Sequence, residues 1–272
     1  SSSQIEMNAD LQFYDGMTSE EIQEILIRSA NDLISLEAPN YQFAAARLLL
    51  YGLHKKVYKR YEHQSLSQII DDNIKRKVYD PAIKDKYSDT ELKKMNTWIK
   101  HERNEDFTYA GLRQVVDKYL CQDRSNGDIY ETPQFMYMMI AATLFADYPA
   151  DTRLSYVKRY YDATSLFKIN IPTPVMAGVR TPIRQFASCV LVDVDDTLPS
   201  IFSSNSAIGY YIAQRAGIGI NSGRTRAINS KIRGGEVAHT GVIPFLKVYE
   251  STVRSCTQNG VRGGSATTHF PI

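Results

Sequence analysis

The fold is decided by residues 189–221, which read CVLVDVDDTLPSIFSSNSAIGYYIAQRAGIGIN. Residues 189–192 form a short apolar run that is typical of a buried strand. A helical stretch follows over about residues 200–214, and residues 219–221 predict a second strand. A strand, a helix and a strand in this order predict parallel α/β architecture, in which ligands bind at strand ends and in loops.

The residues on either side extend this pattern. A short apolar run from Ile169 to Ile171 predicts an earlier strand, and residues 243–255 predict a helix after the second strand. The α/β region therefore begins near Lys168.

The chain before Lys168 predicts helices instead. Capping boxes at Thr18–Glu21 and Ser88–Glu91 mark two helix starts, because the two side chains of each box satisfy one another's backbone N–H groups. Residues 133–148 are apolar almost all round and predict a buried helix, with an amphipathic neighbour at 153–167. Turn residues at 125–128, between short apolar runs, predict a two-stranded hairpin.

Composition and residue spacing exclude several classes of protein. The chain has 272 residues, of which 43% are hydrophobic and 23% charged, as in ordinary globular proteins. No apolar run approaches the ~18 residues of a membrane span, and residues 1–6 lack the features of a secretion signal. Cys121, Cys189 and Cys256 are odd in number and far apart, so we expect no disulfide scaffold and a reducing cytoplasm. The five histidines form no ligand motif, so we expect no metal site.

Charge is distributed unevenly along the chain. The net charge is +2, but from Thr197 onward eight basic residues accompany two acidic ones, which makes this part +6 and residues 1–196 −4. The eight basic residues are Arg215, Arg224, Arg226, Lys231, Arg233, Lys247, Arg254 and Arg262. A basic, glycine-bearing segment suggests an anionic ligand such as a phosphate, and a solvated basic surface is the alternative.

The glycines of residues 217–223 suggest a dinucleotide-binding turn but do not match it. The G-x-G-x-x-G pattern would need glycine at Ser222, and here a helix precedes and a strand follows, which reverses the required order. These glycines still allow backbone N–H groups to approach a ligand, and an ordinary tight turn is the alternative.

Three further features bear on ligand binding, and the first two leave two interpretations each. A carboxylate in Asp195–Asp196 could cap the following helix or bond a ribose hydroxyl. Cys189, at the start of a predicted buried strand, could be a small core residue or a reacting thiol. The glycine-rich loop around Arg262, residues 260–267, is expected to be mobile, which suits a loop that becomes ordered on binding.

Motifs spread through the second half of the chain connect it with a known family. They are LFKINIPTPVMAGVRTP (166–182), RQFASC (184–189), QRAGIGIN (214–221), HTG (239–241), Lys247, SCTQ (255–258) and VRGG (261–264). The chain resembles the large, catalytic subunit of aerobic class I ribonucleoside-diphosphate reductase, of the enterobacterial and T-even-phage type, along all 272 residues.

The resemblance implies a fold and a domain division. It implies an α/β protein with a mainly helical N-terminal region followed by the first half of a ten-stranded α/β barrel, which is incomplete in this chain. The expected domains are a remnant of an ATP cone at 1–57, a mainly helical domain at 58–167 and the half-barrel at 168–272.

The resemblance also assigns a catalytic and a substrate-binding role. Cys189 matches the cysteine that reduces the substrate ribose and forms a disulfide with a partner cysteine further downstream. Thr173, Ser188, Ala216 and Gly217 match positions that hold the ribonucleoside diphosphate.

Nucleotide effectors are expected at two other places. The specificity site matches Asp196, Thr197, Leu198, Arg226, Ile232 and Arg233, with Thr197 where the family has serine. Gln258 and Arg262 match positions that relay the effector's identity to the substrate base, and Asn259 there replaces a glycine. Ser19 and Lys55 match nucleotide contacts of the ATP cone. Gln23 and Gly52 replace histidines of the enterobacterial form, which argues against overall inhibition by dATP.

The implied activity is the reduction of ribonucleoside diphosphates to 2′-deoxyribonucleoside diphosphates, by radical chemistry with a redox cysteine pair, for DNA precursor synthesis. We expect the chain to be inactive alone, because the radical cysteine lies in the missing C-terminal half of the subunit. No cofactor bound by this chain is expected. The expected effectors are dTTP, dGTP, dATP and ATP, with Mg, and the radical cofactor belongs to a small partner subunit.

The other expected partners are the ribonucleoside diphosphate substrate, a second large subunit in a homodimer, and thioredoxin or glutaredoxin as reductant. Neither a membrane nor a nucleic acid is expected. One alternative is a non-catalytic module that binds nucleotide effectors. Another is nucleic-acid binding through the basic segment, which is less favoured because aromatic residues do not alternate with the bases there.

Overall fold

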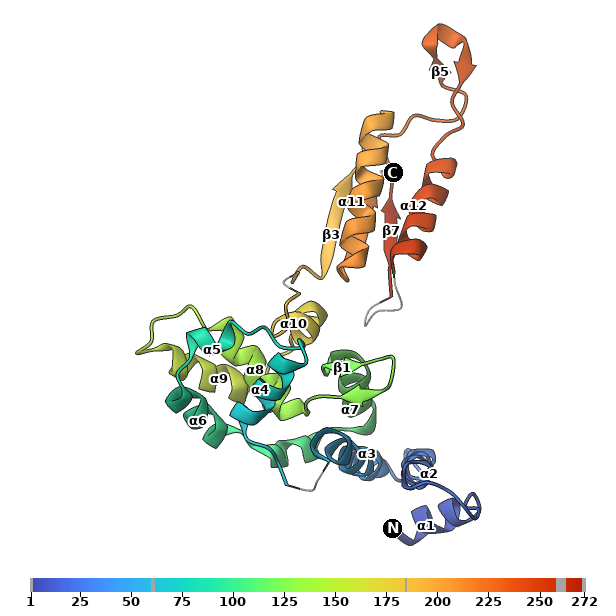
Figure 1. The fold of residues 1–272 in the computed structure, drawn as a ribbon. Coiled ribbons are helices and arrows are strands. Elements are labelled where there is room, and N and C mark those ends of the chain that lie inside the picture. Colours follow the sequence, from blue (N-terminus) through green and yellow to red (C-terminus); the bar gives the residue numbers. More distant parts are fainter. Residues whose placement is uncertain (1, 60–61, 184, 258–262, 271–272) are drawn as a thin grey trace. The chain divides into compact units, whose positions relative to one another are not determined.

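The computed structural model describes residues 2–59, 62–183, 185–257 and 263–270. These residues form two compact units. The first contains residues up to 171 together with 175–183, and the second contains 172–174 together with the residues from 185 onward. Each unit is described by itself (Figure 1).

The first unit is helical. Its helices are α1 (Ser2–Asp10), α2 (Ser19–Asp32), α3 (Tyr41–Tyr58), α4 (Leu66–Lys75), α5 (Ile83–Lys86), α6 (Asp89–Trp98), η1 (His101–Asp106), α7 (Tyr109–Gln114), the π-helical turn η2 (Val115–Tyr119), α8 (Pro133–Leu144), α9 (Arg153–Ser165) and α10 (Thr173–Gly178). The first two residues of α10 belong to the second unit. Both predicted capping boxes are confirmed, since Thr18 and Ser88 exchange hydrogen bonds with Glu21 and Glu91 at the starts of α2 and α6.

The centre of this unit is the predicted buried helix. Every residue of α8 from Pro133 to Ala142 is buried, which confirms the prediction, and α9 packs along it as expected. The predicted hairpin is also confirmed, as β1 (Gln122–Asp123) pairs antiparallel with β2 (Asp128–Ile129).

The strand predicted at Ile169–Ile171 is wrong. These residues are irregular, and Phe167 just before them adopts a left-handed conformation with φ +56°. Pro172 and Pro174 follow, and a proline has no N–H with which to extend a strand ladder. The chain therefore turns here and begins α10.

The second unit is a parallel α/β layer. The strands β3 (Cys189–Asp193), β4 (Gly217–Asn221) and β7 (Ala266–His269) pair in that order, with Cys189 opposite Gly217 and Ile218 opposite Ala266. The helices α11 (Leu198–Ala213) and α12 (Ile243–Cys256) lie side by side and cover one face of the sheet (Figure 1). The predicted strand–helix–strand order is thus confirmed, and the three strands do not close a barrel within the described residues.

One face of this sheet carries the core. Val190 and Val192 of β3 pack with Ile218 and Ile220 of β4 against the two helices. Side chains alternate between the faces of a strand, so Cys189 and Leu191 point to the other face, where Leu191 is 82% exposed. The prediction that β3 is a buried strand is therefore wrong, because helices cover only one of its faces and β4 is its only neighbour among the described residues.

A small hairpin completes the unit. The strands β5 (Lys231–Ile232) and β6 (Val237–Ala238) pair antiparallel around the short turn η3 (Arg233–Gly235). The hairpin projects beyond the carboxyl ends of β3 and β7 (Figure 1). Within the described residues of both units, no helix is long and apolar enough to cross a membrane.

Candidate functional site

The candidate catalytic cysteine lies at the amino end of the sheet. Cys189 is exposed, and its neighbour Ser188 accepts a 2.9 Å backbone hydrogen bond from Gly217 N. Because β3 and β4 both begin here, Ser188, Cys189, Ala216 and Gly217 come together at one edge. The structure therefore gathers four of the five predicted substrate and catalytic residues, while Thr173 begins α10 elsewhere in the chain.

Two local features shape this edge. Arg215 adopts a left-handed conformation with φ +71°, which ends α11 and turns the chain directly into Ala216. Gln185 donates from Nε2 to the carbonyls of Ala187 and Gln214, at 2.9 and 3.3 Å, and so ties the approach to β3 to the end of α11. Sequence analysis missed Gln185, because its partner in the helix lies 29 positions away.

The other cysteines differ from Cys189. Cys121 is buried, and its burial raises the pKa of its thiol well above the ordinary range. A buried thiol that resists deprotonation is a poor nucleophile. Cys256 is partly buried at the end of α12. Of the three cysteines, Cys189 is the most accessible.

The candidate effector residues begin at the opposite, carboxyl end of the same strands. Thr197 caps α11 by accepting from Ser200 N, so neither aspartate supplies the side-chain cap, and the capping interpretation of Asp195–Asp196 is wrong. Asp196 instead contacts Arg226, with 2.6 Å between Oδ2 and Nε and 3.1 Å between Oδ1 and the backbone N.

This contact fixes the charge of Asp196. Partial burial alone would raise the pKa of Asp196, but the backbone N–H and guanidinium of Arg226 outweigh it, and the pKa is lowered. The carboxylate is therefore ionised and holds Arg226 in place. Arg226 also lines a hollow of about 270 Å³, together with Ser222, Gly223, Thr225, Ala227, Ile228, Thr240, Gly241, Val242, Ile243 and Phe270.

A second arginine at this end was not predicted. Arg224 bridges Asp195 and Asp193, with N–O distances of 2.6 and 3.2 Å. Acidic residues at alternate positions of a strand end, with an arginine after the next strand, are the sequence signal that could have revealed it. Arg224 borders a wider hollow of about 870 Å³ on the uncovered face of the sheet.

The remaining candidate effector residues do not all lie beside the Asp196–Arg226 pair. Leu198 is exposed at the start of α11. Ile232 and Arg233 lie on the projecting β5–β6 hairpin, and within the described part of the chain no hydrogen bond or ion pair joins them to Asp196 or Arg226. Gln258 and Arg262 lie outside the described residues.

The base of the predicted relay loop is well defined. Thr257 Oγ1 donates to the carbonyl of Val253 at 2.6 Å and accepts from Gly264 N at 3.1 Å. A β-carbon at Gly264 would lie 2.1 Å from Thr257 Oγ1, so only glycine fits there. The two ends of the loop are thereby held together.

The cone-type residues are also brought together. Lys55 Nζ of α3 donates to Ser19 Oγ of α2 at 3.0 Å, beside a hollow of about 430 Å³. Gln23 lies across Gly52 in this hollow and donates to the carbonyl of Leu48 at 2.6 Å. Elsewhere, no group of three or more His, Cys, Asp or Glu side chains could hold a metal ion in the described ranges.

These features define an α/β protein with an accessible thiol at the amino end of β3 and an ion pair beside a hollow of about 270 Å³ at the carboxyl ends of β3 and β4. Comparison with known proteins shows to which family the chain belongs. Residues 105–184 match the all-alpha domain of ribonucleotide reductase, and residues 187–272 match its barrel domain.

Individual relatives agree with both domain matches. The chain is 51% identical over 99% of its length to ribonucleoside-diphosphate reductase 1 subunit alpha of Escherichia coli, and 50% identical over 95% to the subunit alpha of Enterobacteria phage T4. The chain belongs to the ribonucleotide reductase large-subunit family. It spans 36% and 34% of the length of these two relatives.

Proposed function

We propose that the chain is part of the catalytic subunit of a ribonucleoside-diphosphate reductase and carries its reducing thiol. The observation that carries this proposal is the accessible Cys189, in register with Gly217, in a chain 51% identical to such a subunit. The predicted domain limits at residues 57 and 167 remain predictions.

Cys189 supplies one half of the reduction. Replacing the 2′-hydroxyl of the ribose by hydrogen releases water and consumes two electrons and two protons. Two thiols provide these as they become a disulfide, one being Cys189 and the other a cysteine of the downstream half of the subunit. Thioredoxin or glutaredoxin then restores the thiols, and a small partner subunit supplies the radical that starts the chemistry.

The substrate diphosphate is held at the edge where Cys189 lies. Ser188 and Gly217 meet there through a backbone hydrogen bond, and Gly217 lets backbone N–H groups approach a ligand closely. Thr173, at the first position of α10, is the further substrate contact. We place the reaction in the cytoplasm, where thiols are kept reduced.

Allosteric control belongs to the carboxyl ends of the strands. Arg226, held by Asp196 beside a hollow, suits the phosphates of dTTP, dGTP, dATP or ATP, bound with Mg. Ile232 and Arg233 of the projecting hairpin, with Leu198 on α11, complete the site in a large-subunit homodimer. We expect little overall inhibition by dATP, since Gln23 and Gly52 occupy the cone hollow where the enterobacterial form has histidines.

The test is Cys189→Ser in the assembled enzyme, with Cys256→Ser as the matched control. Serine has no redox chemistry, so Cys189→Ser should abolish steady-state formation of deoxynucleotides while effector binding stays unchanged. Cys256→Ser should retain turnover. Multiple turnovers of Cys189→Ser with thioredoxin or glutaredoxin as reductant would refute the assignment.

A second candidate function is a non-catalytic module that binds nucleotide effectors. It is favoured by one observation, that the Asp196–Arg226 pair and its hollow lie within this chain. Joined to the downstream half and the small subunit, such a module would bind dTTP but form no dCDP from CDP. Without the downstream half, the chain should form no dCDP under either of the two proposed functions.

A further inference from the structure

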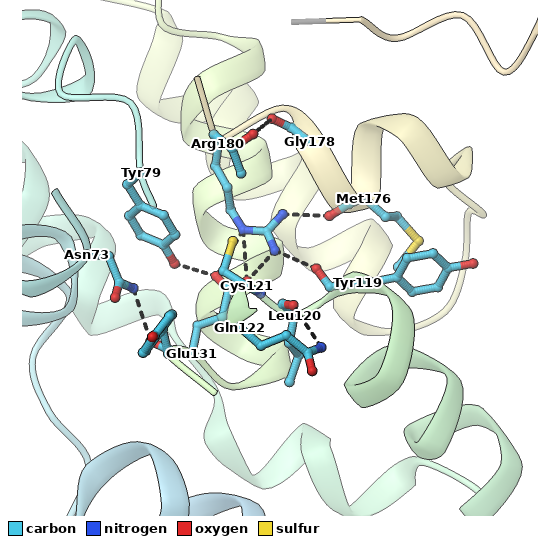
Figure 2. Close-up of polar contacts among 12 residues, drawn as sticks. Asn73, Tyr79, Tyr119, Leu120, Cys121, Gln122, Glu131, Met176, Gly178 and Arg180 are labelled. Atoms are coloured by element: carbon cyan, nitrogen blue, oxygen red, sulfur yellow. Dashed lines mark hydrogen bonds and ion pairs between the residues drawn. The ribbon is translucent and has the colours of Figure 1, made fainter. Parts of the chain in front are cut away.

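A fully buried ion pair joins four segments of the helical unit. Arg180 and Glu131 are both inaccessible to solvent, and the guanidinium contacts the carboxylate through Nε and Nη2 (Figure 2). Nη2 of Arg180 also donates to the carbonyl of Tyr119 at 2.8 Å. The carboxylate in turn accepts from the hydroxyl of Tyr79 and from Cys121 N.

This pair has an unusual relation to α10. Arg180 follows the helix, and its Nη1 reaches back to donate to the carbonyl of Met176 at 2.5 Å. Thr181 donates from both its backbone N and its Oγ1 to the carbonyl of Gly178. Two of the carbonyl groups that a helix leaves unpaired at its end, those of Met176 and Gly178, are thus satisfied by the residues that follow α10.

The helix depends on these contacts. The six residues of α10 are too few to form a stable helix in water, where even Ala-rich helices shorter than about 12 residues are marginal. Its C-terminal end is instead held to Glu131 by the Arg180 side chain and, through the Arg180 carbonyl, to Asp80 N at 2.9 Å.

Stability alone does not explain a charged pair at this depth. Burying two charges removes their hydration, and apolar side chains of similar volume usually stabilise a core equally well or better. The guanidinium also fixes geometry, because its planar fork binds the Glu131 carboxylate and the carbonyls of Tyr119 and Met176 at the same time.

We infer that Arg180 and Glu131 are positioning residues for substrate binding, because they hold the helix whose first residue is Thr173. This inference rests on the proposed function, in which Thr173 contacts the ribonucleoside diphosphate. Neither residue touches substrate. Loosening the pair should let α10 fray and should weaken the contact that Thr173 makes, while leaving the effector site unaffected.

The experiment compares Arg180→Lys with Arg153→Lys in the complete large subunit assembled with its small subunit. Arg153 and Glu91 form a second arginine–glutamate pair in the same unit, with contacts of 2.7 to 2.9 Å, but it joins α9 to α6 and not to α10. Lysine keeps the charge and loses the fork in both variants.

Arg180→Lys should raise the KM for CDP by about fivefold or more with kcat changed much less, which is the pattern of a lost binding contact. Affinity for dTTP should not change. Hydrogen exchange of the amides at 175–180 should also accelerate about tenfold, as expected for local opening. Arg153→Lys should change neither the KM for CDP nor the exchange of these amides, whatever its effect on thermal stability.

If Arg180→Lys does not fold, the double variant Arg180→Met/Glu131→Leu leaves no unpaired buried charge and still removes the link to Met176, so the same result is expected. Equal KM and equal exchange in the Arg180 and Arg153 variants would overturn the inference. If the wild-type enzyme reduces no diphosphate, the proposed function fails, and exchange at α10 separately decides whether the pair holds the helix.

Discussion

Asp196 and Arg226 form a two-point contact across 30 positions of sequence, in which one carboxylate oxygen accepts from the guanidinium and the other from the backbone of the same arginine. Both side chains remain about one-third exposed. Asp196 also accepts from Nη2 of Arg226 through its backbone carbonyl, at 3.5 Å, so the guanidinium meets both the side chain and the backbone of the aspartate. Asp196 thus holds Arg226 at both its backbone and its side chain.

The first prediction concerns this arginine. Arg226→Ala should weaken every triphosphate effector by a similar factor of about tenfold or more, because a hydrogen bond to a charged group contributes about 1.5–3 kcal/mol and phosphates carry no base identity. Calorimetry with dTTP, dGTP and dATP checks it. Arg254→Ala, which removes the same charge from an exposed pair with Glu250, is the control and should bind normally. Unequal losses among the effectors would contradict a phosphate role.

The second prediction separates the relay loop from the effector site. Arg262→Ala should leave effector affinity nearly unchanged but blur which substrate each effector favours, because the resemblance places Arg262 between effector and substrate base. Competition among the four ribonucleoside diphosphates in assembled enzyme measures this choice. Should Arg262→Ala lose affinity as Arg226→Ala does and keep its substrate preference, the basic segment is a plain phosphate-binding surface.

The third prediction concerns the base of the same loop. Gly264→Ala places a methyl group 2.1 Å from Thr257 Oγ1, so the Thr257 side chain must move and its contact with Gly264 N is disturbed. We expect the variant to bind dTTP with normal affinity and to lose most of the substrate preference that dTTP imposes. Gly263→Ala is the matched control, because a β-carbon at Gly263 would have no atom of the described residues within 4 Å. A Gly264 variant with unaltered preference would show that the loop base does not matter for the relay.

Local patterns predicted most of the elements. The capping boxes of α2 and α6, the apolar α8 and the strand–helix–strand order of β3, α11 and β4 all depend on residues close in sequence. The strand predictions failed where pairing or covering by segments distant in sequence determines the structure. Residues 169–171 have strand-like composition but no pairing partner, and β3 is apolar although one of its faces is uncovered.

Candidate site residues followed the same rule. Family motifs named Cys189, Ser188, Ala216 and Gly217, and the strand register gathers them at one edge. No local signal could reveal that Asp196 would engage Arg226 instead of capping α11. The Arg180–Glu131 pair could not be predicted from local patterns either, since its two residues lie 49 positions apart.

The fourth prediction concerns a histidine cluster in the helical unit. His63 stacks on His101 with ring centroids 3.8 Å apart, and His54 meets His63 edge-on at 5.1 Å. Two buried ring nitrogens, His54 Nε2 and His101 Nδ1, have no hydrogen-bond partner among the residues that the structure describes. Burial lowers the pKa of His54 to about 4 and that of His101 to about 3, with the neighbouring histidines adding to the effect.

These depressed pKa values make the helical unit sensitive to acid. Above pH 6.5 the histidines are neutral in both the folded and the unfolded chain, so they add no pH dependence. Between pH 6.5 and about 4 the unfolded chain binds protons that the folded chain does not, so the free energy of unfolding falls as the pH falls, by up to about 1.4 kcal/mol per pH unit for each histidine. Urea unfolding measures this free energy when it is followed by the fluorescence of Trp98, the single tryptophan, which lies in α6 of this unit.

The variant His101→Phe tests the role of the cluster. It keeps an aromatic ring against His63 but cannot be protonated, so the loss of stability from pH 6.5 to 5 should be clearly smaller than in the wild type. His269→Gln, in the exposed strand β7, should follow the wild type. If His101→Phe and the wild type lose stability in parallel over this range, protonation of the cluster does not limit the acid stability of the unit.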